Sequence, residues 1–155
     1  MTIRPACPAD AGDILSLLRQ VNNVHEKNRP DLFIKDKTKY TADELAALLA
    51  DDTRPIFVAE QDGRVCGYAF CVLQSHAGCN NLHDGVTLYL DDLCVDEAVR
   101  GTGIGKALFS HVRDYARDRG VYNLTLNVWD KNDAAMAFYN ACGFHIQKYG
   151  MEMIL

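Results

Sequence analysis

The chain has 155 residues, of which 48% are hydrophobic and 24% charged, which excludes a disordered or fibrous chain and predicts a single domain over residues 1–155. Its formal net charge of −5 argues against nonspecific nucleic-acid binding, which requires clustered Lys and Arg. No apolar run reaches the roughly 18 residues that cross a bilayer, and the amino terminus has no apolar signal segment. We therefore expect a cytoplasmic protein without a membrane or nucleic-acid partner.

The first half of the chain predicts a strand, two helices and a hairpin. Thr41 and Glu44 form a capping box, which places a helix start there. Asp62-Gly63 is a strong two-residue turn between two strand-like runs. The expected elements are strand Thr2–Ala6, a helix with its apolar stripe at Ile14–Val21, an irregular polar segment Asn22–Tyr40, a helix from Thr41, and strands Pro55–Ala59 and Val65–Leu73.

The second half predicts four further strands and two helices. Their order completes a β-α-α-β-β-β-α-β-α-β-β pattern, which is typical of a layered α+β domain with a mixed sheet. The expected elements are a loop Gln74–Gly85, strand Val86–Val95, a helix from Ile104 to Gly120, strand Leu124–Val128, a helix from Asn132 or Asp133 to Gly143, and a terminal hairpin Phe144–Tyr149 and Met151–Leu155.

The cysteines predict neither a disulfide framework nor a metal site. All six are spread along the chain without a Cys-x-x-Cys pair, and several lie in apolar segments where a thiol behaves as a small hydrophobe. His76, Cys79 and His83 offer only three zinc ligands on a loop, with no clear fourth. We expect no metal.

A glycine-rich turn is the most informative segment. It reads Arg100-Gly101-Thr102-Gly103-Ile104-Gly105-Lys106, between a strand and a helix. Glycines let backbone N–H groups approach a ligand, and a helix start offers unpaired donors with partial positive charge, so together they predict a phosphate site. The spacing matches neither a nucleoside-triphosphate loop nor a dinucleotide fold. The alternative is a left-handed turn that binds nothing.

Three blocks together resemble the GNAT superfamily of acetyltransferases. They are the glycine-rich turn after its strand, Leu126-Asn127-Val128-Trp129-x-x-Asn132, and Phe138-Tyr139-x-x-x-Gly143-Phe144, in the family's order. The resemblance implies a mixed, mostly antiparallel twisted sheet with helices on both faces, and acetyl-coenzyme A as co-substrate. It is nearest to the small-molecule branch that includes spermidine/spermine acetyltransferases. The coenzyme-binding residues it implies are Leu93, Cys94, Val95, Arg100, Gly101, Thr102, Gly103, Ile104, Gly105, Lys106, Asn132 and Tyr139.

Two carboxylates are candidates for the catalytic base. An alkylamine has a pKa near that of Lys, ~10.4, so it must lose a proton before it attacks a thioester. Asp91 and Asp92 stand in an otherwise apolar strand, where a carboxylate needs a partner or a function. Because successive strand residues face opposite ways, we expect only one to face the acceptor. Resemblance to the polyamine branch favours Asp91. The alternative is that backbone donors satisfy both.

The resemblance also assigns the remaining chemistry. Tyr139 would protonate the leaving thiolate, with a core aromatic as the rival interpretation. Backbone groups of Leu93, Cys94 and Val95 would bind the pantetheine arm and polarise the carbonyl. An acyl-cysteine at Cys94 is disfavoured, because no His lies at a suggestive position. Asn132 would bind the coenzyme or cap a helix.

The sequence therefore predicts an N-acetyltransferase that moves an acetyl group to a primary amine of a small molecule by direct attack. Acetylation of a protein amino terminus or Lys, and a non-catalytic acyl-coenzyme A sensor, remain alternatives. The resemblance implies that the irregular segment with His25, Glu26 and Tyr40 helps to wall the acceptor pocket; the alternative is that these are solvated loop residues. We expect a homodimer, from the family and from the apolar segment Met151–Leu155.

Overall fold

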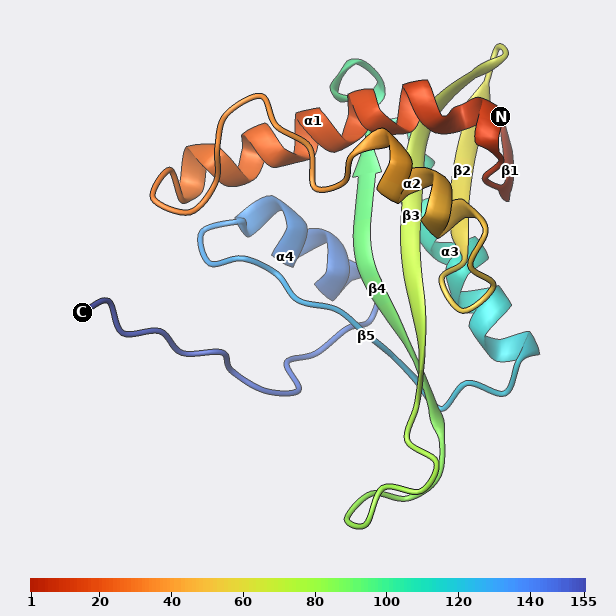
Figure 1. The fold of residues 1–155 in the computed structure, drawn as a ribbon, viewed down its shortest axis with the longest axis vertical. Helices are drawn as coiled ribbons and strands as arrows, with labels where there is room; N and C mark the ends of the chain where they lie inside the picture. The colour runs from red at the N-terminus through yellow and green to blue at the C-terminus, as the bar shows by residue number, and fades with distance from the viewer.

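A computed structural model describes residues 1–155 as one five-stranded sheet with helices on both faces, which confirms the predicted fold class (Figure 1). The strands lie in sequence order; the first four are antiparallel, and the fifth runs parallel to the fourth. None of the helices combines the length and apolar character that a membrane span requires. The elements are β1 Thr2–Pro5, a 3-10 turn Pro8–Asp10, α1 Ala11–Asn28, α2 Ala42–Leu49, β2 Ile56–Gln61, β3 Arg64–Ser75, β4 Val86–Val95, a 3-10 turn Glu97–Val99, α3 Ile104–Asp118, β5 Asn123–Thr125 and α4 Asp133–Ala141.

Two separate apolar clusters hold the helices to the sheet. On one face α1 and α2 pack on β2 and β3, with Leu17, Leu18 and Leu45 almost fully buried. On the other face α3 packs on the same strands and on β4, with Leu108 and Val112 fully buried. Each such side chain contributes about 1.5–3 kcal/mol of hydrophobic free energy. The sheet is thus held by helices on both faces. Residues of β4 lie in both clusters, so both helix layers position this strand.

The predicted capping box is present at the start of α2. The Thr41 hydroxyl accepts a hydrogen bond from the Glu44 N–H at 3.2 Å, and the Glu44 carboxylate accepts one from the Thr41 N–H at 2.7 Å. This reciprocal pair satisfies two donors that a helix start otherwise leaves free. It also fixes the end of the segment that connects α1 to α2, which matters because that segment walls the candidate site.

A β-bulge interrupts the pairing of β3 with β4. Phe70 pairs with Asp92 and Cys71 with Leu90, so Asp91 is an extra residue without a partner. The bulge changes which residues share a face: Leu90 belongs to the cluster under α3, whereas Cys94 belongs to the cluster under α1. Without the extra residue these two side chains would point the same way.

The strands β4 and β5 separate soon after they meet. Their pairing is limited to Thr87–Tyr89 of β4 against β5, so the rest of β4 has no partner along that edge. The Asp96 N–H donates to the Cys66 carbonyl on the β3 side at 2.9 Å. Because backbone groups alternate in direction along a strand, Leu93 and Val95 face the free edge.

Two predicted regions differ in the structure. Helix α1 continues to Asn28, so the first part of the segment expected to be irregular is helical. The predicted terminal hairpin is wrong: residues 144–155 form no strand and extend away from the domain beneath α4 (Figure 1). One ion pair, from Arg29 to Glu152 at 2.9 Å, ties this tail to the end of α1.

Candidate active site

A cavity of about 550 Å³ lies where β4 leaves β5. Its walls come from α1, the connecting segment between α1 and α2, β4, the segment after β5, and α4. The cavity brings together five residues that the sequence singled out as catalytic or coenzyme-binding: Asp91, Asp92, Leu93, Asn132 and Tyr139. The side chains of Cys94 and Val95 and the glycine-rich turn lie outside its walls.

Asp92 lines the cavity and pairs with Phe70, whose side chain lies in the cluster on the α1 side of the sheet. Its carboxylate accepts a hydrogen bond from the buried Tyr68 hydroxyl at 2.7 Å. Burial raises the pKa of Asp92 to about 6, against the opposing effects of the Tyr68 hydrogen bond and of the nearby Lys39. A carboxylate with this pKa is ionised at neutral pH and is a far better proton acceptor than an exposed one.

Asp91 lies in the same cavity and is already paired. Its Oδ2 is 2.7 Å from the Lys39 Nζ and accepts a hydrogen bond from the Tyr40 hydroxyl at 3.1 Å. Only 17% of its side-chain surface is exposed. We expected only one of the two carboxylates to face the acceptor. Both residues line the cavity, and the bulge at Asp91 breaks the strand alternation on which that expectation rested.

Tyr139 projects from α4 into the cavity. Its ring packs edge-on against Phe138 and Phe144, at centroid separations of 5.2 and 5.6 Å. Burial, reinforced by the negative charge of Asp92, raises the pKa of Tyr139 well above its usual value. The phenol is therefore protonated at neutral pH, which is the form a proton donor needs.

The glycine-rich turn forms the open amino terminus of α3. Gly101 and Gly103 have φ of +80° and +91°, and Gly103 is the residue at the helix start. No other part of the protein lies within 4 Å of a Cβ built at either position. The N–H groups of the first turn have no partner inside the helix and carry partial positive charge. This exposed cradle fits a diphosphate.

The side chains around this turn are held by the backbone. Arg100 Nε donates to the Val95 carbonyl at 3.0 Å, and the Thr102 hydroxyl donates to the Val99 carbonyl at 2.7 Å. Arg100 thus lies against the free edge of β4. On the edge itself, Leu93 and Val95 direct their backbone groups outward, whereas those of Cys94 point to β3. Among the three residues expected to bind pantetheine, the geometry favours Leu93 and Val95.

The thiol of Cys94 is poorly suited to covalent chemistry. The residue is 4% exposed in the cluster under α1, and its Sγ lies 3.6 Å from the Leu17 carbonyl. Burial raises the pKa of Cys94 to about 12, so the reactive thiolate is scarce at neutral pH. Asn132, by contrast, has the predicted capping role, because its side chain accepts from the Ala135 N–H at 3.2 Å. It also lines the cavity, and coenzyme binding by Asn132 stays a prediction.

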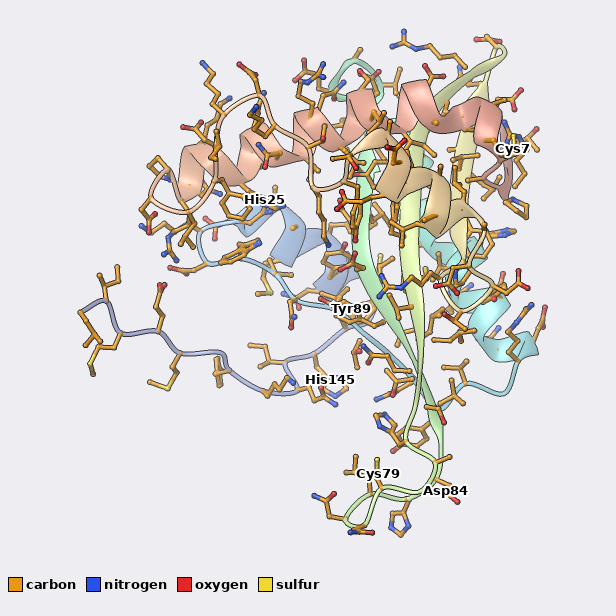
Figure 2. The ribbon with its side chains drawn as sticks, in the orientation of Figure 1. Cys7, His25, Cys79, Asp84, Tyr89 and His145 are labelled. Carbon is orange, nitrogen blue, oxygen red and sulfur yellow. The ribbon has the colours of Figure 1, made fainter.

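The connecting segment supplies cavity residues that the sequence did not single out. Phe33 packs edge-on against Trp129 at 5.3 Å and beside His25 at 5.2 Å, which forms an aromatic wall. His25 lies on α1 rather than in a loop, beneath the helix and above α4 (Figure 2). Burial lowers the pKa of His25. Glu26, a further candidate wall residue, does not line the cavity.

The loop that joins β3 to β4 is remote from the cavity. Cys79 and Asp84 lie at its tip, at the far end of the molecule from His25 (Figure 2). The His76 ring is hydrogen-bonded to the Thr87 hydroxyl at 3.1 Å. No group of three or more His, Cys, Asp or Glu side chains is placed to hold a metal ion.

The model of the acetyltransferase (GNAT) family matches residues 20–144. The chain belongs to the GNAT family. Its GNAT domain is that of an acyltransferase enzyme, and relatives named as N-acetyltransferases match it along most of its length. Thialysine N-epsilon-acetyltransferase of Bos taurus is 32% identical over 91% of this chain and 82% of its own. An uncharacterised N-acetyltransferase of Methanocaldococcus jannaschii is 29% identical over 92% of this chain, which spans only 60% of that protein.

A solved structure shares the fold of this chain over its whole length. The crystal structure of a mutant protein from Bacillus halodurans superposes with a TM-score of 0.95 at 31% identity, covering 100% of this chain and 99% of that one. The agreement over the whole chain shows that the arrangement of sheet and helices around the cavity is that of a known folded protein.

Proposed function

We propose that this GNAT protein transfers the acetyl group of acetyl-coenzyme A to a primary amine by direct attack. The observation that carries the proposal is the cavity at the divergence of β4 and β5, where Asp91, Asp92 and Tyr139 meet. Two carboxylates offer an ammonium group a favourable site and a proton acceptor, and a protonated phenol lines the same cavity. The family to which the chain belongs supports the choice of donor.

Each step has a residue suited to it. The diphosphate of the donor would lie on the N–H groups at the start of α3, beside Arg100 and Lys106. The outward backbone N–H of Leu93 would stabilise the oxyanion. Asp92 would take the proton from the ammonium group as nitrogen attacks the carbonyl carbon, and Tyr139 would give its proton to the departing sulfur.

Replacing Tyr139 by Phe is expected to lower kcat by roughly 10–10³, because the proton donor is lost while the ring packing against Phe138 and Phe144 is kept. Affinity for acetyl-coenzyme A should change little. Steady-state thiol release together with calorimetry measures both quantities. An unchanged kcat, with chemistry shown to limit the rate, would reduce Tyr139 to a packing residue.

We propose a small molecule as the acceptor, because the segment between α1 and α2 walls one side of the cavity, which gives the site the form of a pocket. Thiol release from acetyl-coenzyme A should then be faster with polyamines and lysine-like amines than with peptides that carry the same amine. Peptides as the better substrates would favour the protein-acetyltransferase alternative. Coenzyme binding without thiol release for any amine would favour the sensor alternative.

We also propose that the protein forms a homodimer through its exposed tail. Met151, Met153, Ile154 and Leu155 are each more than three-quarters exposed, which leaves apolar surface without a partner inside the chain. Light scattering should give twice the monomer mass for the full chain, and the monomer mass for a chain that ends at His145. A monomeric full chain would contradict this.

A further inference from the structure

The acceptor cavity already contains a primary ammonium group that belongs to the protein. Lys39 comes from the segment between α1 and α2, and its Nζ lies 2.7 Å from Asp91 Oδ2. The next residue holds the segment in place: the Tyr40 ring stacks on Phe70 at 5.8 Å, and its hydroxyl donates to the same Asp91 oxygen at 3.1 Å. Lys39 is thus a side chain of the same chemical class as the proposed substrate, in the proposed substrate's place.

Lys39 differs from its neighbours in this respect. Lys37 also lines the cavity but forms no ion pair, and Lys35 neither lines the cavity nor forms one. All three lysines belong to one short segment and are exposed. The Lys39 side chain, although paired, keeps 46% of its surface exposed. The three lysines therefore experience similar exposure to free acetyl-coenzyme A, while only Lys39 is held by a carboxylate of the site.

We propose that Lys39 is an internal acceptor, and that the enzyme acetylates its own Lys39 when acetyl-coenzyme A is bound and no external amine is present. This inference rests on the proposed function. The Lys39 ammonium group loses one proton to Asp92, and its nitrogen forms a C–N bond to the acetyl carbonyl carbon. The C–S bond breaks, and the sulfur leaves with the proton of Tyr139 as free coenzyme A. The attacking nitrogen gives up its second proton, which restores the Tyr139 phenol and leaves a neutral amide.

The ion pair makes this reaction slower than transfer to a free amine. Burial alone would lower the pKa of the Lys39 ammonium group, but the hydrogen bond and charge of Asp91 outweigh it and raise the pKa. Loss of the proton is therefore opposed by Asp91. Once acetylated, the side chain has no charge for Asp91 to bind, and a second transfer to the same nitrogen cannot occur. We expect one acetyl group per chain.

The experiment follows acetylation of the full-length protein with acetyl-coenzyme A and no added amine, by intact mass and by peptide mapping. Lys39 should be modified at least about tenfold faster than Lys35 and Lys37, because it is held within the site. The first-order rate constant, measured as the fraction of chains modified per unit time, should not depend on protein concentration, since the reaction occurs within one chain. Tyr139→Phe should slow it, and Lys39→Arg should remove the modification while keeping a cation beside Asp91.

Three results would overturn the inference. They are equal modification of Lys37 and Lys39, a rate constant per chain that rises with protein concentration, and a rate constant unaffected by Tyr139→Phe. A parallel reaction with external amines separates this inference from the proposed function. If external amines are acetylated while Lys39 stays unmodified, the inference fails and the function stands. If neither is acetylated, both fail.

Discussion

Replacing Asp92 by Asn is expected to lower kcat/KM for a primary amine by about 10²–10⁴ near neutral pH. The amide keeps the size of the carboxylate and still accepts the Tyr68 hydrogen bond, but it cannot take a proton. In the wild type, kcat/KM should fall as pH drops through the pKa of about 6, since protonated Asp92 is not a base. In the variant this acidic limb should disappear, and activity should recover toward high pH as free amine accumulates.

Asp91→Asn is the matched comparison. Asp91 is bound by Lys39 and Tyr40, so we expect it to attract the ammonium group rather than to remove its proton. Its loss should raise KM and lower kcat/KM at all pH values, with the acidic limb kept. Thermal melts establish that both variants fold. If Asp91→Asn instead abolishes the acidic limb and Asp92→Asn does not, the roles are reversed, as the resemblance to polyamine acetyltransferases suggested.

Gly103→Asp is expected to weaken binding of coenzyme A by about 10²–10³, because a carboxylate would stand where the diphosphate binds and repel it. Gly103→Asn is the control: Asn has the same size and tolerates the positive φ of this position, but brings no charge. We expect less than about a tenfold loss for the control. Isothermal calorimetry on folded variants measures both.

Equal losses in the two Gly103 variants would show that backbone strain, not charge, is responsible. An unchanged affinity in Gly103→Asp would place the diphosphate elsewhere. Since no protein atom lies within 4 Å of a Cβ at this position, a steric effect on the fold is not expected for either variant.

Much of the fold was predictable because its elements carry local patterns. The capping box at Thr41 and Glu44 and the glycines at 101 and 103 have the structural roles that their chemistry indicates. The end of α1 was missed, since its last residues extend beyond the sheet and bury no continuous apolar stripe. The terminal hairpin was predicted from apolar residues alone, and most of those side chains stay exposed in the structure instead of packing on the sheet.

The sequence was enough to name residues of the candidate site, but not to predict how they are arranged. Asp91, Asp92 and Tyr139 were identified, yet the bulge that brings both carboxylates to one cavity has no sequence pattern of its own. The alternation Leu88, Leu90, Asp92, Cys94 reads as an unbroken strand face. The pairing of Lys39 with Asp91 could not be predicted either, because it depends on the path of the segment between α1 and α2.

The central claim, direct attack by an amine on acetyl-coenzyme A in this cavity, is tested most directly by initial rates with both substrates varied. Direct attack requires that both substrates be bound at once, so double-reciprocal plots of thiol release should intersect. Mapping of the protein after turnover should find no acetyl group on Cys94, whose pKa of about 12 opposes thiolate formation. Parallel lines with an acetylated cysteine, or no thiol release with any amine, would contradict the account.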